Sequence, residues 1–116
     1  AAAACSDPNG VSRSIRSFSW THGRCCGLAA ACTERTKVVY VESLSNPTLR
    51  LANLPMLAEI AHSRDAKLIV DNTFTPLAIT PMDHGADVVV HSLTKFVNGA
   101  SDFIAGAMCG SAEFVS

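Results

Sequence analysis

Residues 68–110 read LIVDNTFTPLAITPMDHGADVVVHSLTKFVNGASDFIAGAMCG, and this stretch indicates the fold of the chain. Two short runs within it, LIVD (68–71) and DVVVH (87–91), have the β-branched, apolar composition of buried strands. Residues 103–109 predict a further strand, whose direction the sequence leaves open. Strands that are apolar on both faces are typical of a sheet with parallel pairs that helices cover.

The sequence before this stretch continues the same alternation of strand and helix. Residues 37–42 (KVVYVE) predict another buried strand, and residues 43–50, which contain Ser-Asn-Pro, predict a loop. Asn53 can cap a helix whose first turn holds Pro55. The apolar face of this helix is formed by Leu54, Leu57, Ile60 and Ala61. The pattern therefore predicts an α/β fold with a mostly parallel sheet and covering helices.

Two shorter elements complete the expected arrangement. Thr80-Pro81 opens a short helical turn that Gly85 can close, and residues 28–35 suggest a short alanine-rich helix. Residues 1–28 show no sustained helical or strand period. We therefore expect residues 1–28 to form a poorly ordered segment and residues 29–116 to form one partial α/β domain.

Composition excludes several classes of partner. The chain has 116 residues, is 48% hydrophobic and 16% charged, and carries a net charge of −1. No basic field favours nucleic acid, and no apolar run is long enough to span a membrane. We expect a cytoplasmic protein, with a plastid location as the alternative because the first segment faintly resembles a transit peptide.

The cysteines do not suggest a disulfide framework, because their number is odd and their spacing irregular. A metal cluster is conceivable from His22, Cys25, Cys26 and Cys32. However, the adjacent cysteine pair lacks the two-residue spacer of ordinary zinc knuckles, so we favour reduced thiols and no metal.

Chemically capable side chains follow two of the predicted strands. Asp71 and Thr73 come at the end of one strand, and Ser92, Thr94 and Lys95 follow the next. In α/β sheets ligands bind outside the carboxyl ends of the strands, so these residues are expected to converge on one site.

The residues of this site suit a phosphate-bearing pyridine cofactor. A lysine at a sheet edge loses hydration, which lowers its pKa and frees the amine for a Schiff base. Ser92 and Thr94 offer hydroxyls to a phosphate, and Asp71 can pair with a protonated ring nitrogen, which makes the ring an electron sink. Asn46 can hydrogen-bond a phenolic oxygen of the ring.

Residues 68–110 resemble the cofactor-binding core of the Cys/Met-metabolism pyridoxal-phosphate (PLP) enzymes. Residues 38–49 (VVYVESLSNPTL) resemble the strand and Glu-x-x-x-Asn-Pro loop of the same family. The segments VVVHSLTKF and DFIAGAMCG are most similar to those of plant methionine γ-lyases. The resemblance implies part of the large domain of a fold type I PLP-dependent transferase.

The resemblance also implies roles for the predicted site residues. Lys95 would be the Schiff-base lysine and later move protons on the substrate, and Asp71 would pair with the pyridine nitrogen. Ser92 and Thr94 would contact the phosphate. Thr73 and Asn46 would lie beside the ring and its phenolic oxygen. The implied reaction is that of a PLP-dependent carbon–sulfur lyase, converting methionine to methanethiol, ammonia and 2-oxobutanoate.

Several alternatives stay open at this point. Cystathionine γ-synthase, γ-lyase and β-lyase share the quoted motifs, and a truncated, catalytically inactive remnant is a further alternative. The resemblance implies a tetramer for full-length relatives and a sulfur-containing amino acid as substrate. Asn98 and Ala100 differ from the Ser-Gly-His motif that is common in bacterial relatives. The family's remaining phosphate loop, stacking aromatic residue and carboxylate-binding arginine match no part of this sequence, so we expect weak or absent turnover.

Overall fold

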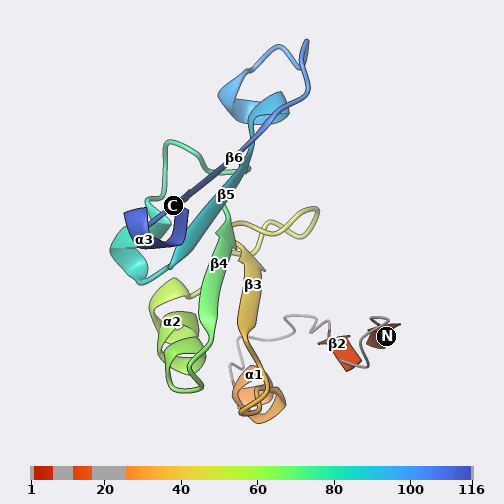
Figure 1. Ribbon diagram of the computed structural model, residues 1–116. Helices are drawn as coiled ribbons and strands as arrows, with labels where there is room; N and C mark the ends of the chain where they lie inside the picture. The colour runs from red at the N-terminus through yellow and green to blue at the C-terminus, as the bar shows by residue number, and fades with distance from the viewer. Residues whose placement is uncertain (1, 7–11, 17–25, 116) are drawn as a thin grey trace.

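The computed structural model describes residues 2–6, 12–16 and 26–115 (Figure 1). A mostly parallel sheet with helical connections forms the main part of the structure, as the sequence predicts. The strands are β1 (Ala2–Ser6), β2 (Ser12–Arg16), β3 (Val38–Glu42), β4 (Lys67–Asp71), β5 (Val88–Ser92) and β6 (Gly106–Gly110). The helical elements are α1 (Cys26–Ala31), α2 (Leu54–His62), a 3₁₀ turn (Pro81–His84), a π turn (Leu93–Val97) and α3 (Ala112–Val115).

The main sheet has four strands in the order β3-β4-β5-β6. Strands β3, β4 and β5 are parallel, with Glu42 paired to Asp71 and Asp71 paired to Val90. Strand β6 runs antiparallel to β5, with Gly106 opposite Ser92, which decides the direction that the sequence left open. The carboxyl ends of three strands therefore meet at one edge of the sheet, and Figure 1 shows the following loops leaving it there.

Helix α2 covers one face of this sheet and forms the core with it. Asn53 caps the helix as predicted: its side-chain oxygen accepts a hydrogen bond from the Met56 N–H at 3.3 Å. The buried face of α2 consists of Leu54, Leu57, Ala58 and Ala61. It packs in one core cluster with strand residues Val39, Leu68, Val70 and Val89. Because side chains alternate along a strand, Asp71 lies on the opposite face from Val70.

Gly85 ends the 3₁₀ turn in the way that its sequence position predicts. Its φ of +89° lies in the left-handed region, and its N–H donates to Met82 O. A Cβ atom at this position would come within 2.7 Å of the Ala58 Cβ. The turn can therefore pack closely on α2 only with glycine at its end.

Asp87 joins neighbouring elements at the amino-terminal edge of the sheet. Its carboxylate accepts hydrogen bonds from the Leu68 N–H at 2.8 Å, His62 Nε2 at 2.8 Å and Lys67 Nζ at 2.9 Å. Burial opposes ionisation here, but the hydrogen bond from Leu68 and those from the two side chains prevail and lower the pKa of Asp87 to about 2. This edge lies opposite the one where the predicted site residues gather.

The described part of the first segment contains paired strands, although the sequence shows no strand period there. Strands β1 and β2 pair antiparallel, with Ala4 opposite Ser14. Helix α1 spans residues 26–31, whereas the sequence suggested a helix over 28–35. Within the described residues, no helix is long and apolar enough to cross a membrane.

Candidate active site

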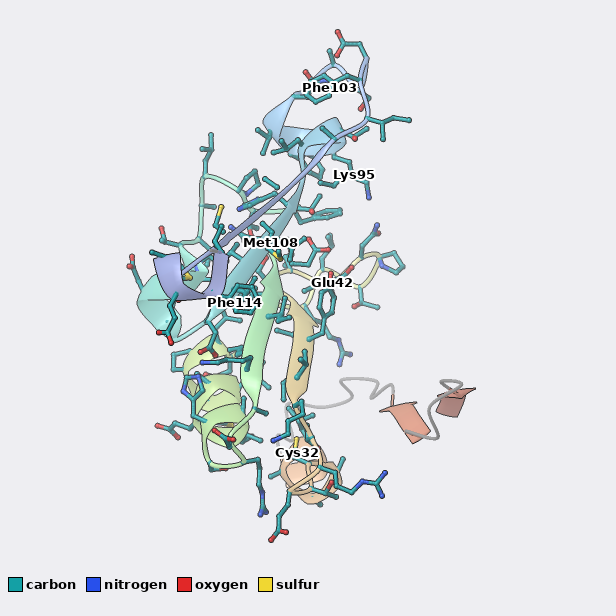
Figure 2. The ribbon with its side chains drawn as sticks, in the orientation of Figure 1. Cys32, Glu42, Lys95, Phe103, Met108 and Phe114 are labelled. Atoms are coloured by element: carbon teal, nitrogen blue, oxygen red, sulfur yellow. The ribbon has the colours of Figure 1, made fainter. Side chains whose placement is uncertain are left out.

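Three strand ends form one open pocket at the carboxyl edge of the sheet. The residues that line it are Glu42, Leu44, Asn46, Asp71, Thr73, Phe74, Ser92 and Lys95. Five of the six residues that the sequence predicted for the site, all except Thr94, are among them. Figure 2 shows Lys95 and Glu42 at the same end of the sheet, with the lysine on the turn that follows β5.

The Asp71 carboxylate is held at both oxygens. The Thr73 N–H donates to Oδ1 at 3.0 Å, and the Tyr40 hydroxyl donates to Oδ2 at 2.9 Å. Burial raises the pKa of Asp71, but these hydrogen bonds and the nearby charge of Lys95 outweigh it, so the pKa lies below its ordinary value. The pocket therefore contains an ionised carboxylate with a fixed orientation, which suits a protonated ring nitrogen.

Thr73 connects the ends of β4 and β5. The residue is 7% exposed, and its hydroxyl oxygen accepts a hydrogen bond from the Ser92 N–H at 2.8 Å. The backbone of the preceding residue also crosses this gap, because the Asn72 N–H donates to Val90 O at 2.9 Å. Ser92 is thus placed relative to Asp71 by Thr73, which accepts a hydrogen bond from the Ser92 N–H and donates one to the Asp71 carboxylate.

Asn46 reaches the pocket from the loop after β3. Its N–H donates to Glu42 Oε2 at 3.1 Å, which closes the start of the loop against the end of the strand. The Ser45 and Thr48 hydroxyls are 2.6 Å apart, and the Ser45 hydroxyl also accepts the Arg50 N–H at 3.0 Å. These contacts fold the loop back on itself and leave the Asn46 side chain at the pocket wall.

Lys95 lies in the π turn that continues β5. Phe96, its neighbour, packs against Phe74 with ring centroids 5.0 Å apart, which connects this turn to the loop after β4. The lysine side chain is exposed. The loss of hydration expected at this sheet edge is therefore not found in this chain, because the described residues leave the pocket open to solvent.

Thr94 faces away from the pocket in this structure. Its hydroxyl accepts the Ala105 N–H at 3.0 Å and lies 3.3 Å from Ala105 O, to which it donates. The hydroxyl hydrogen is thus already used within the protein, where a phosphate would need it as a donor. Thr94 directly precedes Lys95 in the π turn, and the direction of its side chain depends on how the segment before β6 approaches.

Four residues in or beside the site were not singled out from the sequence: Glu42, Leu44 and Phe74 line the pocket, and Tyr40 contacts Asp71. Glu42 ends its strand as Asp71 does, so the strand-end argument applied to it equally. Phe74 and Tyr40 gave no such signal, because their contribution depends on the ring contact and on the register of β3 against β4.

No group of three or more histidine, cysteine, aspartate or glutamate side chains that could hold a metal ion occurs among the described residues. His22 and Cys25, two members of the conceivable cluster, lie outside the described residues. Cys32 belongs to the hydrophobic core, and this burial raises the pKa of its thiol despite the nearby Arg64.

Relatives of the chain share both sequence and fold with it. Methionine gamma-lyase of Arabidopsis thaliana is 52% identical over 81 residues, which are 70% of this chain and 18% of that protein. Cystathionine gamma-lyase of Dictyostelium discoideum is 45% identical over 82 residues, covering 70% of this chain and 21% of the relative. The chain thus spans about a fifth of the length of these curated relatives.

Solved structures agree with this similarity. Cystathionine gamma-lyase from Lactobacillus plantarum, complexed with L-serine, superposes with a TM-score of 0.74 at 33% identity over 79% of this chain and 24% of that one. Cystathionine gamma synthase from Xanthomonas oryzae pv. oryzae gives a TM-score of 0.65 at 44% identity, over 68% of this chain and 21% of that one. The family described as Cys/Met metabolism PLP-dependent enzyme matches residues 14–116, so the match starts ahead of residue 29, where the α/β domain was expected to begin. The chain therefore belongs to the Cys/Met metabolism PLP-dependent enzyme family.

Proposed function

We propose that this chain carries the cofactor-binding part of a PLP-dependent carbon–sulfur lyase that acts on methionine. The observation that carries the proposal is the convergence of Asp71, Ser92 and Lys95 on one pocket from two neighbouring strand ends. An ionised carboxylate, a hydroxyl and a primary amine are the groups that a pyridine ring, a phosphate and an aldehyde require. The residues present therefore fit PLP.

Each residue has a distinct part in this proposal. Lys95 Nζ would hold the cofactor covalently, and Asp71 would hold the proton on its ring nitrogen. Ser92 would donate to the phosphate, and Asn46 would donate to the phenolic oxygen. When bound, PLP withdraws electrons from the Cα of an amino acid, which makes the Cα proton removable.

The lysine would also act as the acid and base of the reaction. A free Nζ amine beside the pocket can take the proton from the substrate Cα and return it at a neighbouring carbon. For methionine, loss of the γ-thiol gives methanethiol, and hydrolysis then gives ammonia and 2-oxobutanoate. The methionine γ-lyase assignment is supported by the 52% identity to the Arabidopsis thaliana enzyme.

The first test is an absorbance titration of the purified chain with PLP, with Lys95→Ala measured in parallel. We expect a visible band that is absent from the variant, because the Nζ that holds the aldehyde is then missing. Lys37→Ala is the matched control: Lys37 is an exposed lysine whose ion pair with Asp65 is long, at 3.8 Å. A band that survives Lys95→Ala would contradict the assignment of the lysine.

The second test separates the substrates. Methanethiol, cysteine and 2-oxo acid release would be measured with L-methionine and with L-cystathionine, each with PLP in excess. We expect only slow methanethiol release by this chain, since Lys95 is exposed and the pocket is open to water, which weakens the positioning that supplies much of an enzyme's rate. Faster product release from cystathionine than from methionine would favour a cystathionine lyase instead.

A further inference from the structure

Tyr40 lies beside the candidate active site and contacts one of its residues directly. It stands on β3 two positions before Glu42, and the register pairs Glu42 with Asp71. Because alternate residues of a strand share a face, Tyr40 is on the same face of the sheet as the Asp71 carboxylate. Its hydroxyl donates to Asp71 Oδ2 at 2.9 Å. Tyr40 itself does not line the described pocket, so it would affect the site through its contact with Asp71.

We infer that Tyr40 is a positioning residue for the reaction, because its hydroxyl fixes the Asp71 carboxylate in the orientation that meets the ring nitrogen. This inference rests on the proposed function. The torsion that turns a carboxylate is broad, so one hydrogen bond leaves the plane of the group free to rotate. Here Thr73 holds one oxygen from the strand's own end and Tyr40 holds the other from the neighbouring strand.

The charges around the pair keep the proton on the phenol. Partial burial, the hydrogen bond to Asp71 and the negative charges of Asp71 and Glu42 raise the pKa of Tyr40 to about 12. The charge of Lys95 helps to keep the pKa of Asp71 below its ordinary value. Tyr40 therefore remains a donor and Asp71 remains an anion throughout the neutral range, which is the state that a protonated pyridine requires.

The contact can be tested in the chain without cofactor, because Tyr40 is the only tyrosine of the sequence. Near-ultraviolet absorbance of tyrosinate therefore reports this side chain alone. At about pH 10.5, roughly three quarters of an ordinary tyrosine is ionised, against about 3% of one with a pKa near 12. We expect the wild-type chain to stay un-ionised there, and Asp71→Asn to be more ionised than wild type, because the negative charge of Asp71 is gone while the burial of Tyr40 remains. A wild-type chain that titrates like free tyrosine would overturn the inference.

The role toward the cofactor needs a second measurement, PLP affinity by absorbance titration. Tyr40→Phe keeps the ring and removes the hydroxyl, and we expect it to bind PLP about three- to tenfold more weakly, the usual net contribution of one hydrogen bond. In an Asp71→Asn background, Tyr40→Phe should change the affinity no further, whereas a merely structural role would weaken both backgrounds equally. Ser63→Ala is the control, since it removes a hydroxyl that donates to Ile60 O at 2.8 Å, at the end of α2.

The outcomes distinguish this inference from the proposed function. A wild-type band that depends on Lys95 but is equally strong in Tyr40→Phe would overturn the positioning role and leave the proposed function in place. A wild-type chain with no band that depends on Lys95 would overturn both. Circular dichroism of Tyr40→Phe would be recorded first, and the Asp71→Asn comparison removes any general loss of stability from the result.

Discussion

Removal of the Thr73 hydroxyl would test whether hydrogen bonds between strand ends hold the site together. In Thr73→Val the shape of the side chain is kept, but the Ser92 N–H loses its acceptor at 2.8 Å. A buried donor left without a partner costs about 1–3 kcal/mol, and Thr73 is only 7% exposed, so little water can replace the hydroxyl. We expect the free energy of unfolding to fall by about 2 kcal/mol.

Thr73→Ser is the matched comparison, because it keeps the hydroxyl and loses one methyl group. Burial of a methylene-sized group is worth about 0.8 kcal/mol, so this variant should be the more stable of the two. Urea unfolding followed by circular dichroism measures both. With urea m-values of about 1–3 kcal/mol per M, Thr73→Val should lower the midpoint by roughly 1 M. If Thr73→Ser proved as unstable as Thr73→Val, packing of the methyl group and not the hydrogen bond would dominate.

Two further perturbations test the fold around the site. Gly85→Ala should destabilise the chain by about 2 kcal/mol or more, because it combines a left-handed φ with a close approach to Ala58. Gly99→Ala shares only the positive φ and should cost about 1 kcal/mol. Thermal unfolding of the two variants separates the backbone strain from the steric clash, and equal losses of stability would argue against the clash. Because the pKa of Asp87 is depressed to about 2, its contribution is complete above an unfolded pKa near 3.8 and is lost as the pH falls toward 2. After allowance for solvent screening we expect this contribution to be about 1 kcal/mol. The urea midpoint of Asp87→Asn should therefore lie below that of wild type at about pH 6, and the two midpoints should approach each other at about pH 2.5. The exposed Asp83→Asn control should follow wild type at both pH values.

The sheet could be predicted closely because its strands are short, β-branched and apolar. Residues 68–71 and 87–91 were predicted as strands, and β4 and β5 occupy 67–71 and 88–92. The direction of β6 could not be predicted, since its composition suits pairing in either sense and the choice depends on the turn after Lys95. The pairing of β1 with β2 was also missed, because neither strand shows the alternation of apolar and polar residues that a half-buried strand requires.

The candidate site could likewise be predicted only in part from the sequence. Asp71, Ser92 and Lys95 were predicted to converge because the carboxyl ends of parallel strands share one edge, and the pocket contains all three. The contact between Tyr40 and Asp71 joins residues 31 positions apart in the sequence, and only the register of two strands brings them together. A strand-end argument finds which residues reach an edge, but not which of them turn toward one another.

The two halves of the pocket are held by different kinds of contact, and this difference bears on how the site works. Asp71 and Ser92 are tied to Thr73 by hydrogen bonds at the ends of paired strands, so their geometry follows from the sheet. Lys95 lies in a turn beyond the sheet. Hydrogen bonds of Thr94 hold that turn to Ala105, and the ring contact of Phe96 joins it to the loop after β4. Hydrogen bonds are more directional than ring contacts. Because Thr73 holds Asp71 by a hydrogen bond, substitutions at Thr73 should change the placement of the carboxylate. Substitutions at Phe96 should act on the approach of the amine.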